Sequence, residues 1–340
     1  MTDKYRILRV DPCGQADFDS LSSAAFFLKN NRIPTRLILA PTAYNESVVF
    51  ECDNLILEGG TDNPEDTLIA DAHFAKEKYT DGFERGTFRT AVVRTDGRNI
   101  TIRNLTIRNS SGNGKKYGQA IALYSDGLGI TVENCRLLGY QDTLFTAPFP
   151  ALNKHGKNEG FGPKNDMPRD PSVQIYRNCY IEGDVDFIFG GATALFENCT
   201  IFSHDAVKEI DPDDKTSCRG YIAAPCTVQG LYYGYLFLGC RLVSDCPDGT
   251  VYLGRPWRPF GRAVFIDCTY GAHINRKLFD DWNDRRNRET AYFAVSENMA
   301  GESLTEQKNN DNSPEFPFVL GEEAANRYIG EFKAYIAQYF

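Results

Sequence analysis

Short stretches in which apolar and polar residues alternate recur along the chain. They include "ITIRN" (100–104), "ITVEN" (130–134), "VQIYRN" (173–178) and "AVFID" (263–267). Alternation with a period of two predicts β-strands that bury one face. A chain with many such stretches is expected to be all-β.

A shorter phrase accompanies these stretches and recurs seven times. Its members share an Asn, Asp or Gly, then Cys or Leu, a polar or small residue and usually an apolar one: "DNLILEG" (53–59), "RNLTIRN" (103–109), "ENCRLLG" (133–139), "RNCYIEG" (177–183), "ENCTIFS" (197–203), "LGCRLVS" (238–244) and "IDCTYGA" (266–272). The tightest spacing, from Cys179 to Cys199, is 20 residues. Recurrence near this length is typical of solenoids, and short strands with small turns indicate a parallel β-helix.

The cysteines fit this repeat better than they fit a metal or redox site. The chain has ten cysteines, and none are spaced as CxxC. Because free cysteine packs as a small hydrophobic residue, we expect five of them to form an inward-facing ladder on successive coils rather than disulfides or metal ligands. The five are Cys135, Cys179, Cys199, Cys240 and Cys268.

The two ends of the chain differ from its middle. Residues 17–31 and 321–340 have helical apolar patterns. They predict short helices that cover the open ends of the stacked core. No linker divides the chain, so residues 1–340 are predicted to form a single domain. The Gly-, Pro- and Asn-rich segment 146–171 predicts a long loop, and loops of this length are often functional.

Composition narrows the class of protein. Hydrophobic residues make up 42% of the chain and charged residues 24%, as in soluble globular proteins with a sizeable core. The net charge of −9 disfavours a nucleic-acid partner. The chain has no run of 18 apolar residues, so no membrane span is expected. The first residues carry no apolar secretory segment, so we expect a cytoplasmic protein, with secretion after removal of a leader as the alternative.

Four polar stretches beside the strands are candidates for a site: "GQAIAL" (118–123), "GYQDTLF" (139–145), "GDVDFIFGG" (183–191) and "LGRPWRPFG" (253–261). In a parallel β-helix, successive coils lie about 4.8 Å apart, so these stretches can meet on one outer face. The four histidines have no metal-site spacing, and no GxSxG motif indicates a serine nucleophile.

Two aspartates in these stretches suggest acid–base or nucleophilic chemistry. Asp142 and Asp186 would have pKa values that split if they lie close together, since two carboxylates cannot both ionise easily. Arg255 could pair with one of them and keep it ionised. Gln119 and Gln141 offer neutral donors that suit an oxyanion.

Trp257 offers an apolar face to a sugar ring. Simpler interpretations remain open for each of these residues. A single aspartate at a turn is usually a turn residue, an Arg–Asp pair is more often structural than catalytic, and the tryptophan could belong to the core. The residues by themselves therefore favour a two-carboxylate site on a β-solenoid without naming its substrate.

The same four stretches match, in order, signature segments of a known family. "GQAIAL", "GYQDTLF", "DVDFIFGG" and "YLGRPW" are similar to the GQAVAL, GYQDTL, VDFIFG and LGRPW segments of the pectin methylesterase (pectinesterase) family. The likeness runs from about residue 8 to about residue 335. It implies an all-β, right-handed parallel β-helix that hydrolyses C6 methyl esters of galacturonate in pectin or oligogalacturonides.

The resemblance also implies roles by position. Asp186 matches the family's nucleophile, which forms an acyl-enzyme, and Asp142 matches its general acid/base. Gln119 and Gln141 match the residues that stabilise the oxyanion. Arg255 matches the arginine that hydrogen-bonds the nucleophile. No metal and no organic cofactor are implied.

Four further residues are expected to contact substrate. Trp257 matches a substrate-contacting aromatic residue. In "LFDDW" (278–282), Phe279 stands where the family usually has a sugar-stacking tryptophan. Val185 and Thr90 are expected to line subsites. Asp184, in contrast, is predicted to be a turn or rim residue.

The loop 146–171 begins four residues after Asp142 and is expected to narrow or cover the cleft, which would favour shorter substrates. Three rival functions remain: a pectate-lyase-like β-helix, a thioesterase-like relative, and an inactive carbohydrate-binding solenoid. We expect a monomer with no nucleic-acid or membrane partner.

Overall fold

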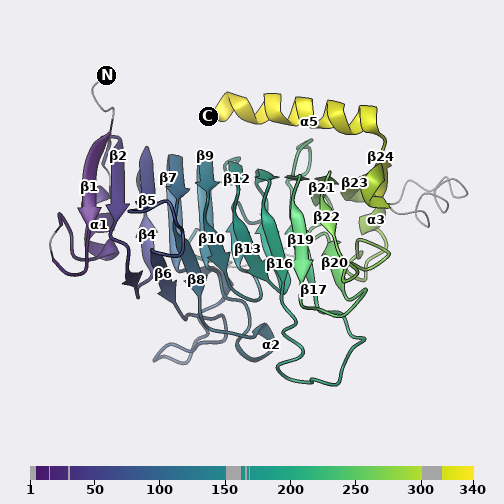
Figure 1. Cartoon of the computed structure of the whole chain (residues 1–340), viewed down its shortest axis with the longest axis horizontal. Helices are drawn as coiled ribbons and strands as arrows, with labels where there is room; N and C mark the ends of the chain where they lie inside the picture. The colour runs from purple at the N-terminus through teal and green to yellow at the C-terminus, as the bar shows by residue number, and fades with distance from the viewer. Residues whose placement is uncertain are drawn as a thin grey trace, which may run out of the picture.

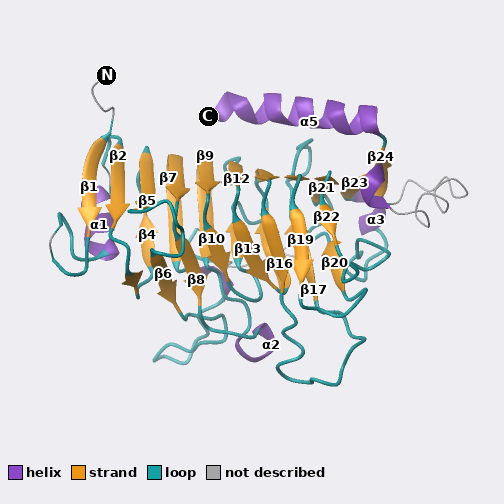
Figure 2. Cartoon of the chain, in the orientation of Figure 1, coloured by secondary structure: helices purple, strands orange, loops and turns teal. Residues whose placement is uncertain are grey.

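Figures 1 and 2 show short strands wound into a stack of coils that follows the order of the sequence. The computed structural model describes residues 5–14, 16–29, 31–150, 162–164, 167, 169–300 and 316–340. Neighbouring strands of the coils pair in parallel, as in Val173↔Thr193 and Ala194↔Tyr235. The fold is a right-handed parallel β-helix, as the sequence predicts.

One long sheet runs the length of the stack. Its strands, in spatial order, are β1 (Arg6–Val10), β2 (Thr35–Leu39), β5 (Leu55–Gly59), β7 (Val93–Arg103), β9 (Leu123–Glu133), β12 (Val173–Arg177), β15 (Thr193–Glu197), β18 (Tyr235–Leu238), β21 (Arg262–Ile266), β23 (Tyr292–Ser296) and β24 (Phe318–Leu320). The long strands β7 and β9 bend and also pair with strands of another face.

Two more rows of strands complete the coils. The second sheet contains β3 (Ala43–Tyr44), β6 (Leu68–Asp71), β8 (Thr106–Asn109), β10 (Arg136–Leu138), β13 (Tyr180–Gly183), β16 (Thr200–Ser203), β19 (Arg241–Ser244) and β22 (Thr269–Tyr270). The third row contains β4 (Val48–Phe50), β11 (Leu144–Thr146), β14 (Val185–Gly190), β17 (Gly220–Pro225) and β20 (Val251–Gly254), and it joins the long sheet through β7 and β9.

In six of its seven copies the repeated phrase marks a sharp turn between the long sheet and the second sheet. The first copy, at Asn54, lies instead between β4 of the third row and β5 of the long sheet. The first residue of the Asn-Cys type pair in the phrase has a φ between 49° and 62° in all seven copies: Asn54, Asn104, Asn134, Asn178, Asn198, Gly239 and Asp267. This left-handed conformation is least costly for Gly, Asn and Asp. The turn therefore explains why these residue types recur at that position.

The five cysteines predicted to form a ladder are buried and free. Each thiol donates to a main-chain carbonyl of the preceding coil at 3.3–3.6 Å, as Cys179 does to Val132 and Cys240 to Phe196. A second interior stack contains aromatic rings with centroids 4.2–4.8 Å apart, from Tyr176, Phe196, Phe237 and Phe265. The predicted packing role of the cysteines is confirmed.

The helix expected within residues 17–31 forms over a shorter range. Helix α1 (Leu21–Leu28) begins after Ser20, whose side chain accepts the Ser23 N–H. Its buried face joins the core beside the first coils, through Leu21, Ala24, Ala25 and Leu28.

The C-terminal helix forms as predicted but lies elsewhere. Helix α5 (Glu322–Ile336) runs along the side of the stack, parallel to its long axis, and does not cover the open end (Figure 1). Its apolar side chains form one buried cluster with outward-facing residues of the long sheet, and Phe332, Leu195 and Leu236 belong to it. The prediction that it covers an end is therefore wrong.

Four further helices of the described residues are single turns: η1 (Thr87–Arg89), α2 (Gly114–Tyr117), α3 (Asn287–Thr290) and η2 (Ala337–Tyr339). Residues 297–300 are also helical. Of the predicted loop 146–171, Thr146 ends β11, and residues 151–161, 165, 166 and 168 lie outside the described residues. Within the described part of the chain, no helix is long and apolar enough to cross a membrane.

Candidate active site

A cavity of about 280 Å³ is lined by residues of the third row of strands and of the turns that flank it. Its lining includes all five residues predicted to be catalytic, and Trp257 as well. The lining residues are Thr87, Phe88, Gln119, Gln141, Asp142, Asp186, Phe189, Ala224, Arg255, Trp257 and Trp282. The coil spacing thus brings four separate sequence stretches to one place.

Asp186 lies at an irregular point near the start of β14. The register of β14 against β17 shifts between Val185 and Ile188, and Asp186 has a φ of 52°. Such bulges re-aim a side chain that would otherwise follow the strand alternation. The side chain of Asp186 points to the cavity although it is only 7% exposed.

Arg255 holds this carboxylate in a bidentate ion pair. Its Nε donates to Oδ1 of Asp186 at 2.8 Å, and its second terminal nitrogen donates to Oδ2 at 2.7 Å. The planar guanidinium lies between two aromatic rings, with its central carbon 3.7 Å from the centroid of Tyr221 and 3.8 Å from that of Trp282. These stacking contacts fix the plane in which both hydrogen bonds form.

Asp142 lies in the turn between β10 and β11, with a φ of 66°. Its N–H donates to the carbonyl of Val185 at 3.1 Å, which ties this turn to the strand that carries Asp186. Burial raises the pKa of Asp142 well above its usual range, and the carboxylates of Asp186 and Asp184 raise it further. Asp142 therefore favours its protonated form.

Asp186 differs from Asp142 in its partner. Burial raises the pKa of Asp186 as well, but the hydrogen bonds and charge of Arg255 oppose that rise. When the two carboxyl groups share one proton, Asp142 is the better place for it. This is the arrangement of an acid beside an ionised nucleophile or base.

The two glutamines lie on adjacent coils and both line the cavity. The main chain pairs them, because the N–H of Ala120 donates to the carbonyl of Gln141 at 3.0 Å. Gly114 leaves the room that the Gln141 side chain occupies, since a Cβ at Gly114 would lie 2.6 Å from Gln141 Oε1. The amide groups can therefore act together as donors.

An aromatic wall completes the cavity. The rings of Phe189 and Trp257 lie 5.6 Å apart, and Phe88 lies 6.2 Å from Phe189. Apolar rings on one side of charged groups reduce contact with water and strengthen electrostatic interactions.

Two residues predicted to contact substrate are buried elsewhere. Phe279 is 3% exposed and packs in the core, 4.8 Å from Phe293 and 6.0 Å from Phe265. Thr90 is fully buried, where its hydroxyl donates to the Thr87 carbonyl and accepts the Ile121 N–H. Neither residue lines the cavity, so the structure contradicts both assignments.

Trp282 and Thr87 line the cavity instead. Trp282 closes the same "LFDDW" segment that contains Phe279, and the Asp280 side chain accepts its N–H at 2.7 Å. Val185 is partly exposed but does not line the cavity, and its contact with substrate stays a prediction. Asp184 forms a turn, as predicted, but it is 4% exposed and is not a rim residue.

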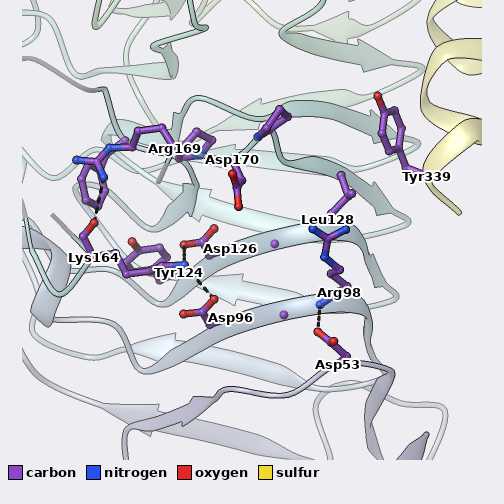
Figure 3. Close-up of a pocket in the computed structure, with 15 residues that line it drawn as sticks. Asp53, Asp96, Arg98, Tyr124, Asp126, Leu128, Lys164, Arg169, Asp170 and Tyr339 are labelled. Carbon is purple, nitrogen blue, oxygen red and sulfur yellow. Dashed lines mark hydrogen bonds and ion pairs between the residues drawn. The ribbon is translucent and has the colours of Figure 1, made fainter. Parts of the chain in front are cut away.

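A second cavity, of about 490 Å³, lies beside the bends of β7 and β9 (Figure 3). Lys164 bridges those bends, with Nζ 2.9 Å from Asp96 Oδ1 and 2.7 Å from Asp126 Oδ2. Phe149 also lines it, and its ring lies 5.3 Å from Phe88 of the first cavity. Described parts of the 146–171 segment thus contact the aromatic wall of the candidate active site.

Comparison with known proteins identifies the family. The model of the pectinesterase family matches residues 9–150 and 170–331. The chain belongs to the pectinesterase family. Pectinesterase 31 of Arabidopsis thaliana is 31% identical over 295 residues, which cover 85% of this chain and 81% of that protein. The chain covers 33% of a longer relative from the same plant, probable pectinesterase/pectinesterase inhibitor 64.

Solved pectin methylesterases share the fold. The enzyme PemA from Erwinia chrysanthemi superposes with a TM-score of 0.70 at 21% identity, covering 95% of both chains. A pectin methylesterase in complex with a hexasaccharide gives a TM-score of 0.70 at 23% identity, again over 95% of both chains. These likenesses establish the parallel β-helix, while the pectinesterase family match makes this chain an enzyme of that family.

Proposed function

We propose that this enzyme removes methyl groups from C6 methyl-esterified galacturonate residues of pectin or oligogalacturonides. Membership of the pectinesterase family supports the substrate class. The structural neighbour solved with a hexasaccharide supports binding of an oligosaccharide by this fold. The observation that carries the chemistry is the ionised Asp186–Arg255 pair beside the protonation-prone Asp142 in one cavity.

The first step is acyl transfer to the enzyme. A carboxylate oxygen of Asp186 attacks the carbonyl carbon of the ester, and the carbonyl oxygen becomes an oxyanion. Side-chain amides of Gln119 and Gln141 donate to that oxyanion; by analogy with other oxyanion holes, each preorganised donor contributes roughly 2.7–4 kcal/mol. Asp142 gives its proton to the departing methoxy oxygen, so methanol leaves and an acyl-enzyme remains.

The second step returns the enzyme to its starting state. Asp142, now a carboxylate, takes a proton from water, and the resulting hydroxide attacks the acyl carbon. The glutamines again stabilise the oxyanion. Asp186 leaves as a carboxylate, which its ion pair with Arg255 stabilises as a leaving group. The products are protonated Asp142 and free galacturonic acid, which releases its proton to solvent water to become the carboxylate.

Substitution Asp186→Asn tests this assignment directly. Methanol release from methylated oligogalacturonides should fall by a factor of about 10⁴ or more, because an amide cannot form the acyl-enzyme. The variant should still fold and bind the oligosaccharide. Asp53→Asn is the control for loss of one negative charge. Asp53 lies at an exposed turn that is distant in sequence from Asp186, so this variant should retain methanol release.

The same assay separates the rival functions. Unsaturated products that absorb ultraviolet light without release of methanol would indicate a lyase, and cleavage of an acyl-thioester alone would indicate a thioesterase-like enzyme. Undiminished methanol release by Asp186→Asn would refute the nucleophile. Binding of oligogalacturonide by a wild-type protein that is inactive on every ester would indicate a carbohydrate-binding solenoid.

A further inference from the structure

Asp184 is a buried carboxylate that the proposed reaction does not use. It lies in the turn between β13 and β14 and is 4% exposed. Its Oδ1 accepts the N–H of Val185 at 2.6 Å. Among the described residues, this carboxylate has no cationic hydrogen-bond partner. Burying such a group costs stability, so its presence calls for a reason.

The main chain of Asp184 connects two turns of the site. Its N–H donates to the carbonyl of Tyr140 at 3.2 Å, and Tyr140 immediately precedes Gln141 and Asp142. The next residue, Val185, accepts the N–H of Asp142 at 3.1 Å. These two hydrogen bonds therefore fix the position of the turn that contains Asp142 relative to β14, the strand that carries Asp186.

Asp184 also contacts the strand that orients Arg255. Its carbonyl accepts the N–H of Tyr221 at 3.1 Å, and Tyr221 stacks on the guanidinium of Arg255. A Cβ at Gly220 would lie 1.9 Å from the Asp184 carbonyl oxygen, so the two coils meet there without space for a side chain. The close fit leaves Asp184 little freedom to move away from the site.

The Asp184 carboxyl group interacts electrostatically with four charged or titratable side chains: Tyr140, Asp142, Asp186 and His204. His204 in turn has two acidic neighbours: its Nε2 lies 3.3 Å from Glu182 Oε1, and the charge of Asp245 raises its pKa. Its ring stacks on that of Tyr140, with the centroids 5.3 Å apart. Arg255 is engaged by Asp186. Asp184 thus shares one environment with both proposed catalytic aspartates.

The balance of these groups leaves Asp184 ionised at neutral pH. Burial raises the pKa of Asp184 to about 6, and the Val185 N–H and His204 oppose that rise. Burial lowers the pKa of His204, but the contact with Glu182, together with the charges of Asp245 and Asp184, outweighs it and raises that pKa overall. Above about pH 6, then, the ionised Asp184 is a second negative charge, besides Asp186, that acts on Asp142.

We propose that Asp184 is a positioning residue whose buried negative charge keeps Asp142 protonated for the acyl-transfer step. This inference rests on the proposed function. Asp184 does not line the cavity and does not touch the reacting ester. It acts through Asp142, and its hydrogen bond to Val185 holds the charge at a fixed place.

A purely structural role predicts something different. If Asp184 only supplied an acceptor to the Val185 N–H, asparagine would replace it, because the amide oxygen of asparagine accepts the same bond. Asp184→Asn keeps the acceptor and removes the charge, whereas Asp184→Ala removes both. The pair of variants therefore separates turn geometry from electrostatics.

The experiment is the pH dependence of kcat/KM for methanol release by the wild type and both variants. The basic limb, where Asp142 loses its proton, should move to lower pH by about one unit in Asp184→Asn, since a nearby like charge has been removed. KM at the pH optimum should stay unchanged. Asp184→Ala should show the same shift and also a lower kcat.

Asp53→Asn is a matched control. The Oδ1 atom of Asp53 accepts the N–H of Arg98 at 2.7 Å, so this substitution likewise keeps a main-chain acceptor and removes one charge, but at an exposed turn. Its pH profile should coincide with that of the wild type. A profile of Asp184→Asn that also coincides with the wild type would overturn the inference. A wild type that releases no methanol at any pH would instead refute the proposed function.

Discussion

Arg255 is held from three directions, and each contact restricts its guanidinium in a different way. The two hydrogen bonds to Asp186 fix it within its plane, while Tyr221 and Trp282 cover its two faces. Lysine has neither the fork nor the flat faces that this arrangement uses. The ionised state of Asp186 therefore depends on two aromatic residues as well as on the charge of Arg255.

Substitutions Trp282→Ala and Phe279→Ala should separate a residue of the site from a residue of the core. Trp282→Ala removes a stacking contact of about 1–2 kcal/mol, so kcat/KM for methanol release should fall about tenfold with a small change in stability. Phe279→Ala leaves a cavity and should lower the free energy of unfolding by about 3–5 kcal/mol. Steady-state kinetics and denaturant unfolding measure the two effects.

The reverse pattern would contradict both assignments. If Phe279→Ala lowered kcat/KM at unchanged stability, the phenylalanine would contact substrate after all. The misassignment has a plain physical cause. Leu278 and Trp282 have φ values of 61° and 59°, so the segment 278–282 follows neither a strand nor a helix period, and no periodicity tells which aromatic ring faces the cavity.

At the scale of elements, the repeat predicted the coil well. The Asn, Asp or Gly of each phrase makes a left-handed turn, and the following Cys or Leu enters the core. Both positions can therefore be recognised in the sequence by their residue types. The four polar stretches converged because parallel coils place equivalent positions beside one another. What the sequence could not show was the partner of α5, because an apolar stripe says that one face is buried but not against which surface.

The 146–171 segment also carries an element-scale prediction. Lys164 ties it to the bends of β7 and β9 through Asp96 and Asp126. Gly162 packs against Phe88, where a Cβ would lie 2.5 Å from the phenylalanine Cβ. If this segment narrows the cleft, Lys164→Met should raise the ratio of kcat/KM on long pectin to that on a short oligogalacturonide, by up to about fivefold for contacts worth about 1 kcal/mol.

Lys333→Met is the control for loss of a lysine ion pair. Lys333 lies on α5, and its Nζ is 2.6 Å from Glu197 Oε1 on the long sheet. This substitution should leave the ratio unchanged, because the pair lies on a different face from the cavity. An unchanged ratio in Lys164→Met as well would mean that the segment does not influence chain-length preference.

At the scale of the whole molecule, the candidate active site lowers the stability of the folded protein. Asp142, Asp184 and Asp186 are all buried, and burial raises the pKa of each. Rigid parallel coils can hold like charges together because the cysteine ladder and the aromatic stack fix the backbone around them. Such a cluster costs folding free energy once its members ionise, as expected where activity needs groups that packing alone would exclude.

Asp184→Asn should therefore make the folded protein more stable, and only at higher pH. The carboxyl group has a pKa of about 6 in the folded protein and about 3.9 in an unfolded chain, so the folded state binds this proton more tightly. Wild-type stability is then lost relative to the variant as pH rises from about 4 through about 6, reaching a difference of about 3 kcal/mol. Denaturant unfolding at pH 4 and pH 8 measures it, with Asp53→Asn expected to follow the wild type. Equal stability of Asp184→Asn and the wild type at pH 8 would contradict this prediction and would mean that the Val185 N–H and His204 fully offset the cost of burying the charge.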